Sequence, residues 1–153
     1  MISKSHLEDL FAYTRWAHKR AYESIGTITG DSTRVLWLLN HILGAETVWY
    51  RRFSDPENAN TALWLQYPPA EAYHELEAMG EKWQALLTAT SEEALLKPIT
   101  FTNTKGLVFT HPAGQILNHV ALHGMYHRGQ LATAVREAGG TPAVTDYVAY
   151  VRE

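Results

Sequence analysis

The chain has 153 residues, of which 46% are hydrophobic and 19% charged, as is typical of a soluble domain with a real core. The net charge of −3 argues against a nucleic-acid surface, and no stretch is apolar enough to span a membrane. The absence of cysteine excludes disulfides, thiolate metal sites and a cysteine nucleophile. We expect one cytoplasmic domain over residues 1–153, because no apolar leader precedes the first helix.

The first predicted helix runs from Ser5 to Ile25, where apolar residues recur every three or four positions. Ser5 followed by Glu8 has the form of a capping box, and Gly26 favours the end of the helix. His18 lies on the apolar row. A single histidine in such a row is more often packed in a core than bound to a metal.

The second predicted helix begins after a cap at Asp31 or Ser32 and ends near Phe53. His41 is the odd residue within it, because its neighbours three and four positions away are apolar. A buried histidine without a partner is costly, so His41 requires either a structural hydrogen bond or a metal.

Residues 54–68 are a long connection for two helices, and such a link can cross the end of a bundle to join two parallel helices. Trp64 within it could pack as a lid or cover an edge of the core. A third helix is predicted from Pro69 to Thr90, and Ser91 begins a short extra turn.

Residues 99–102 and 107–110 are β-branched and aromatic, and the glycine-containing turn between them predicts a small hairpin. Thr110 is then expected to cap the last long helix, which runs to Ala138 and stops at Gly139.

Two glycines interrupt this last long helix, Gly124 and Gly129. Each costs around 1 kcal/mol relative to alanine in a helix interior. The close approach of another helix or of a ligand would offset that cost. After this helix, Asp146 is expected to cap a final helical turn.

The last long helix carries a histidine at every fourth position: His119, His123 and His127. Residues four apart lie one turn apart on nearly the same face, so two imidazoles can bind one metal ion. HExxH zinc helices use this spacing, but the glutamate of that motif is missing here. His123 and His127 lie on the apolar row, whereas His119 heads a mixed row and is expected to flank the site. Alternatively, these are core or boundary histidines with hydrogen-bond partners.

His41 could complete this pair of histidines. It lies ~13 Å from the start of its helix, and His127 lies ~17 Å before the end of the last one. If the two helices run antiparallel, these heights nearly agree. A shared metal would then explain all three histidines at once.

At this point the chain resembles the DinB/YfiT-like family of metalloenzymes. The matching features follow the order of the family and are residues 40–50 (Asn-His-Ile-Leu-Gly-Ala-Glu-Thr-Val-Trp-Tyr), the Thr-Asn-Thr-Lys-Gly turn, residues 119–130, and Thr145-Asp146-Tyr147. The His-Arg-Gly-Gln sequence that ends the third of these is the most specific.

The resemblance implies an all-α fold, an up-down-down-up four-helix bundle with a small β-hairpin before the last long helix, and usually a homodimer. It also implies a divalent metal bound by three histidines that match His41, His123 and His127. Relatives with known chemistry include bacillithiol-dependent S-transferases and mycothiol-dependent isomerases.

Three histidines leave open positions on a metal, as in catalytic zinc sites. The first hypothesis is therefore a metal-dependent enzyme that transfers a low-molecular-weight thiol to an electrophilic small molecule. Without cysteine the protein cannot supply the sulfur, so a thiol cosubstrate must. The alternatives are a metal-dependent hydrolase and a non-catalytic metal-binding stress-response protein. Nitrogen ligands suit several metals, of which we expect Zn or Ni.

Two further residues could support such a site from outside the ligand shell, Glu46 and Arg128. Both residue types are more often solvated or structural. We expect no nucleic-acid and no membrane partner.

Overall fold

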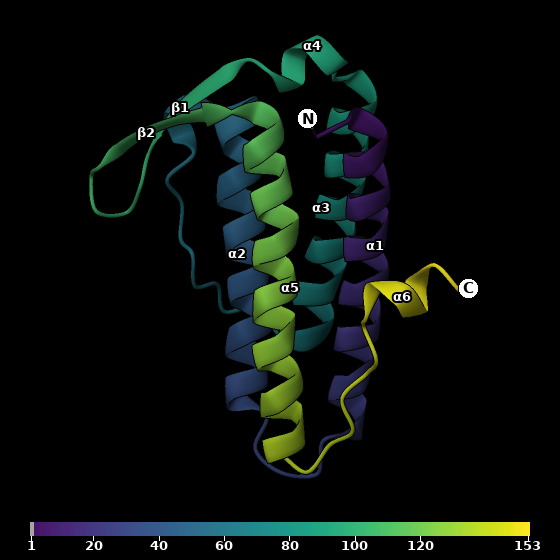
Figure 1. Cartoon of the computed structure of the whole chain (residues 1–153). Coiled ribbons are helices and arrows are strands. Elements are labelled where there is room, and N and C mark those ends of the chain that lie inside the picture. The colour runs from purple at the N-terminus through teal and green to yellow at the C-terminus, as the bar shows by residue number, and fades with distance from the viewer. Residues whose placement is uncertain (1) are drawn as a thin grey trace.

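The structure is a computed structural model that describes residues 2–153. In this part of the chain four long helices lie side by side (Figure 1). These helices are α1 (Lys4–Glu23), α2 (Thr33–Ser54), α3 (Pro69–Ala89) and α5 (Ala113–Glu137). Helices α1 and α2 each contact both α3 and α5. The predicted helical fold is confirmed at this level.

Short elements join and follow the long helices. They are two 3-10 turns (Ser24–Thr27 and Pro56–Asn58), two short helices, α4 (Glu92–Leu95) and α6 (Tyr147–Tyr150), and two strands, β1 (Pro98–Thr102) and β2 (Val108–Pro112). The strands pair antiparallel, with Phe101 opposite Phe109. The expected hairpin before the last long helix is therefore present.

The first helix begins two residues earlier than its capping pattern predicts. Ser3, not Ser5, is the cap, and its Oγ accepts a hydrogen bond from the backbone N–H of His6 at 3.2 Å. Glu8 lies 3.8 Å from the amine of Lys4 instead of closing a capping box. A second serine two residues upstream offered the same chemistry, and the apolar spacing alone could not choose between them.

The hairpin extends further than its β-branched residues predict, so the expected cap at Thr110 is wrong. Thr110 lies in β2, and its hydroxyl is 2.8 Å from that of Thr100 on the neighbouring strand. Helix α5 begins only after Pro112. Cross-strand threonine pairing stabilises the hairpin and thereby postpones the start of the helix.

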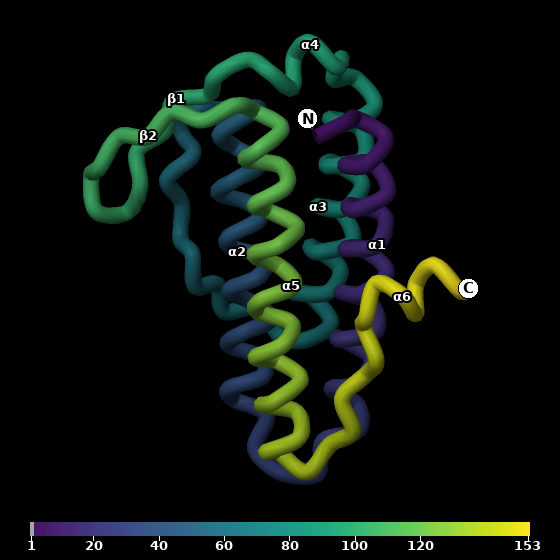
Figure 2. Tube along the Cα trace, viewed as in Figure 1, coloured from purple at the N-terminus to yellow at the C-terminus, as the bar shows by residue number. Residues whose placement is uncertain are grey.

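The link between α2 and α3 does not cross an end of the helices. Figure 2 shows it descending along the outer side of α2. Gly44 makes this path possible, because a Cβ atom there would lie 2.4 Å from the carbonyl oxygen of Leu63. The absence of a side chain at one position therefore determines where the link packs.

The core lies between the long helices and is centred on Trp83, which is 1% exposed. Its ring lies 5.1 Å from that of Phe11 and 5.2 Å from that of Tyr50. Burial of such side chains is the main favourable contribution to folding. Within the described residues, none of the helices combines the length and the apolar character needed to cross a bilayer.

Candidate metal centre

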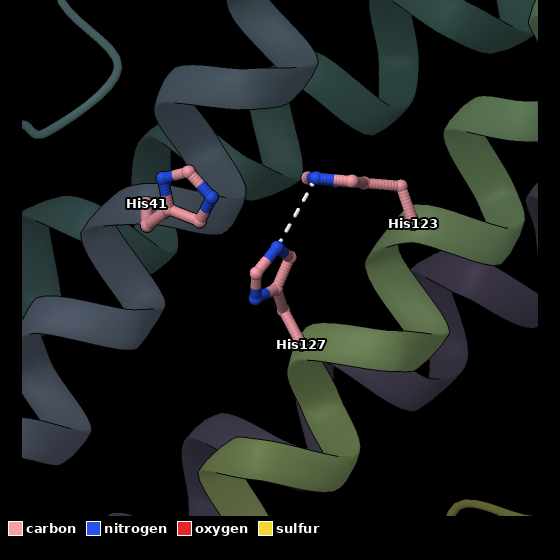
Figure 3. Close-up of side chains that lie close together, drawn as sticks. All are labelled: His41, His123 and His127. Atoms are coloured by element: carbon pink, nitrogen blue, oxygen red, sulfur yellow. Dashed lines mark hydrogen bonds between the residues drawn. The ribbon is translucent and has the colours of Figure 1, made fainter.

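The structure brings together the three histidines that the sequence singles out. His41 comes from α2, and His123 and His127 come from α5 (Figure 3). One ring nitrogen from each lies within 4.8 Å of the other two. The Nε2 atoms of His123 and His127 are 3.1 Å apart. Helices α2 and α5 pack together and run in opposite directions (Figure 1), which places His41 level with the pair.

The backbone of the link orients the ring of His41. Its Nδ1 lies 3.3 Å from the carbonyl oxygen of Leu63, the residue that packs against Gly44. A carbonyl can only accept, so Nδ1 carries the proton and donates it. The other nitrogen, Nε2, is therefore left with a free lone pair.

Helix α5 orients the ring of His127 in a similar way. Its Nδ1 lies 2.7 Å from Oε1 of Gln130, three residues further along the helix. With the proton donated to this oxygen, Nε2 of His127 faces the centre of the cluster with a free lone pair. Two of the three histidines thus have a partner that selects the tautomer needed by a metal.

Two tryptophans cover His41. The ring of Trp64 stacks on it at a centroid distance of 3.8 Å, and Trp37 stacks on Trp64 at 3.9 Å. Trp64 thus lies over a histidine of the cluster rather than over an edge of the core. This stacking restricts the ring of His41 from the side of the link.

Two of these histidines, His41 and His123, favour the neutral state. Burial, and then the nearby rings of His127, His119 and His41, lower the pKa of His123 to about 4. Burial is also the main cause of the lowered pKa of His41. Neutral imidazoles are the form that binds a metal, since a protonated ring has no lone pair to offer.

The arrangement fits a divalent ion. With bonds of about 2.1 Å, two nitrogens 3.1 Å apart subtend roughly 95° at the ion, which is close to the angles that such ions adopt. The three ring nitrogens lie within 4.8 Å of one another, and this distance is only slightly more than the roughly 4.2 Å that separates two opposite ligand atoms of one ion. The donor set, three imidazoles, suits zinc and nickel alike.

His119 lies outside the cluster, as expected. Its ring is 5.6 Å from that of His123 and packs edge-on against Trp49 at 5.1 Å. The side chain is exposed, and its ring lies against Trp49, whereas the ring of His127 lies 4.5 Å from that of His41.

A second group of polar residues lies in the core beside the cluster. The sequence singled out two of them, Glu46 and Arg128, but did not reveal that they are buried. Glu46 is 4% exposed and Arg128 2% exposed, so neither is solvated. Nε2 of His18, also buried, is 3.5 Å from Oε1 of Glu46. Burial raises the pKa of Glu46 to about 7, although Arg128 opposes this shift. Burial and the charge of Arg128 lower the pKa of His18 well below its usual range.

Gly124 provides the space for this polar group. A Cβ atom there would lie 3.3 Å from Nη1 of Arg128, 3.4 Å from Nε2 of His18 and 3.8 Å from Oε1 of Glu46. In the sequence, the sign of this polar group was the position of Gly124 and Arg128, each of which directly follows a histidine of the cluster. By contrast, a Cβ at Gly129 would meet no described atom within 4 Å, so close approach does not explain that glycine.

Comparison with known proteins gives two matches. The family model described as the DinB family matches residues 1–153. The chain is also similar to Protein DinB of Bacillus subtilis (strain 168), with 25% identity over 157 residues that cover 93% of this chain and 91% of that protein.

Proposed function

Because the chain belongs to the DinB family, we propose that it is a metal-dependent enzyme that transfers a low-molecular-weight thiol to an electrophilic small molecule. The observation that carries this proposal is the convergence of His41, His123 and His127. In the described chain this group contains no fourth histidine or carboxylate. Three protein ligands are typical of catalytic sites, which keep a position for substrate.

The three histidines would hold a divalent ion, Zn or Ni in our proposal. Such an ion would make a coordinated thiol acidic enough to react as a thiolate. Other residues of the chain orient the rings of these ligands. Leu63 and Gln130 fix the proton-bearing nitrogens of His41 and His127, and Trp64 limits the movement of the His41 ring.

The reaction balances without a cysteine in the protein. The thiol loses its proton to solvent, and a lone pair of its sulfur forms a bond to the electrophilic carbon. The leaving group departs with the electron pair of its bond to that carbon. The sequence has no cysteine, so the sulfur comes from a cosubstrate.

The same proposal extends to the architecture. We propose a single domain over residues 1–153, with α1, α2, α3 and α5 in the up-down-down-up order of the family. We also propose a homodimer. A cytoplasmic location follows from the reaction, because reduced thiols are maintained in that compartment.

Metal analysis and a thiol-transfer screen test this function. The purified protein, loaded with Zn or Ni, is mixed with 1-chloro-2,4-dinitrobenzene and one thiol at a time (cysteine, glutathione or bacillithiol), and thioether formation is followed. We expect a rate above the metal-free background that is lost in His127→Ala. Turnover without thiol, giving the phenol, would instead indicate a hydrolase. A bound metal with no turnover, either with or without a thiol, would support the non-catalytic alternative.

A further inference from the structure

A cavity of about 400 Å³ lies under the hairpin, beside the histidine cluster. Its walls come from α2, both strands and the first turns of α5. Cavities of this size are typical of sites for small molecules. His119 forms part of the wall, and its ring is 5.6 Å from that of His123, so the cavity ends about one helical turn from the cluster.

The cavity is walled by aromatic rings. Phe101 packs edge-on against Trp49 at 5.1 Å and lies nearly parallel to Phe109 at 6.0 Å. Outside the cavity wall, the guanidinium of Arg52 lies 4.0 Å from the ring of Trp49 and 4.3 Å from that of Phe101. This cation–π contact holds the two rings in place.

The polar groups of the cavity are amides and imidazoles. Its lining includes the amides of Asn103 and Gln115 and the imidazole of His111, and no Asp, Glu, Lys or Arg among the described residues. Flat rings favour a flat partner, because stacked and edge-on contacts are worth about 0.5–1.5 kcal/mol beyond area burial. The two amides suit one or two neutral polar substituents and offer nothing to a full charge.

We infer that this cavity binds an uncharged planar aromatic molecule with one or two polar substituents. The identity of this molecule rests on the proposed function. If that function holds, the bound molecule is the electrophile, and its reactive carbon lies at the His119 end of the cavity. A second copy of the chain is a less suitable occupant of this cavity. Protein interfaces are broad surfaces of about 800 Å² per partner, whereas this site is a small hollow.

The binding test uses 2-naphthol as the probe and decahydro-2-naphthol as a puckered comparator with the same skeleton. Isothermal titration calorimetry on the full chain should show saturable binding of 2-naphthol, at least about tenfold tighter than that of the comparator. Phe109→Ala, which removes one wall, should weaken binding about tenfold or more. Val108→Ala is the matched control, since Val108 is exposed on the same strand and does not line the cavity. It should bind 2-naphthol like the wild type.

A variant that fills the cavity tests the inference even if the hairpin unfolds in Phe109→Ala. Gln115 is exposed at the cavity wall, so Gln115→Trp can occupy the space without disturbing the core, and it should abolish binding. No saturable binding, or equal affinity in the wild type, Phe109→Ala and Gln115→Trp, would overturn the inference. A change from dimer to monomer in Phe109→Ala, without 2-naphthol binding to the wild type, would also overturn it in favour of a second copy.

The two proposals fail separately. The binding measurement is repeated on His127→Ala, which lacks the proposed metal ligand, and 2-naphthol should bind unchanged. Binding without any thiol transfer would overturn the proposed function and leave the cavity site. Thiol transfer to 1-chloro-2,4-dinitrobenzene that neither 2-naphthol nor Gln115→Trp reduces would overturn the assignment of the electrophile to this cavity.

Discussion

His119 and His127 each lie one helical turn from His123, yet only His127 turns its ring toward His41. The centroids of the His41 and His127 rings are 4.5 Å apart, whereas His119 packs on Trp49. Three imidazoles spread over ~12 Å of one helix axis cannot readily meet at one ion, because a metal–nitrogen bond is only about 2.0–2.1 Å. A ligand from the facing helix α2 avoids this strain.

His119→Ala should therefore retain the metal, with at most about a 10- to 100-fold loss of affinity. His123→Ala and His127→Ala should lose it almost completely. Metal content after gel filtration, followed by a zinc titration of the chelated proteins, distinguishes these outcomes. If His119→Ala abolishes binding while His127→Ala spares it, the ligand assignment is wrong.

Glu46 provides a prediction that does not depend on metal. Its carboxyl ionises near pH 4.5 in the unfolded chain and at about pH 7 in the folded one. Between these values the folded protein holds the extra proton, so the contribution of Glu46 to the free energy of unfolding is full below pH 4.5 and is lost as the pH rises through 7.

Glu46→Gln lacks this titration. From pH 4.5 to pH 8 its free energy of unfolding should improve relative to the wild type by about 3 kcal/mol. Urea unfolding of both proteins in the presence of a chelator, at several pH values, measures the difference. Parallel stability curves for the two proteins would show that Glu46 keeps an ordinary pKa.

At the scale of elements, the contact between α2 and the link positions the ring of His41. Gly44→Ala places a Cβ atom 2.4 Å from the carbonyl oxygen of Leu63, so the link must move away from the helix. The hydrogen bond from His41 to that oxygen is then lost. We expect metal affinity to fall about tenfold or more, as measured by competition with a chromogenic chelator.

Gly129→Ala is the matched control in α5. A Cβ atom there meets no described atom within 4 Å, so the variant should gain about 1 kcal/mol of stability from helix propensity alone. Its metal affinity should equal that of the wild type. Equal metal affinity in Gly44→Ala as well would mean that the link has no role in orienting His41.

For the molecule as a whole, a metal that binds only the folded state must stabilise it. At a free metal concentration 100 times the dissociation constant, the gain is about 2.7 kcal/mol. For a chain of this length that corresponds to a rise in Tm of roughly 5–10 °C. Calorimetry with added Zn or with a chelator measures the shift, and His127→Ala should show none. An equal Tm in both conditions for the wild type would contradict binding at this site.

The exposed face of α5 bears on the predicted homodimer. Leu122, Met125 and Tyr126 are all exposed there, and apolar side chains grouped on a surface often mark an interface. Light scattering at micromolar concentration should give the mass of two chains. Leu122→Glu should shift this mass toward one chain, because an interface core disfavours an unpaired charge. A monomer mass for the wild type would contradict the dimer.

The sequence by itself determined the helices and the histidines worth testing. Helical periodicity depends on neighbours three and four residues apart, so the apolar rows and the pairing of His123 with His127 were visible without a structure. The absence of cysteine likewise limited the ligands to nitrogen and oxygen. Metal binding itself stays a prediction.

Only the tertiary structure decided what surrounds those histidines. The stacking of Trp64 on His41 depends on a link that packs along α2, more than twenty residues away in the chain. The burial of Glu46 and Arg128 depends on α1, α2 and α5 meeting around Gly124. Residue type predicts solvation for a carboxylate or a guanidinium, and only the packing of other elements over it can reverse that preference.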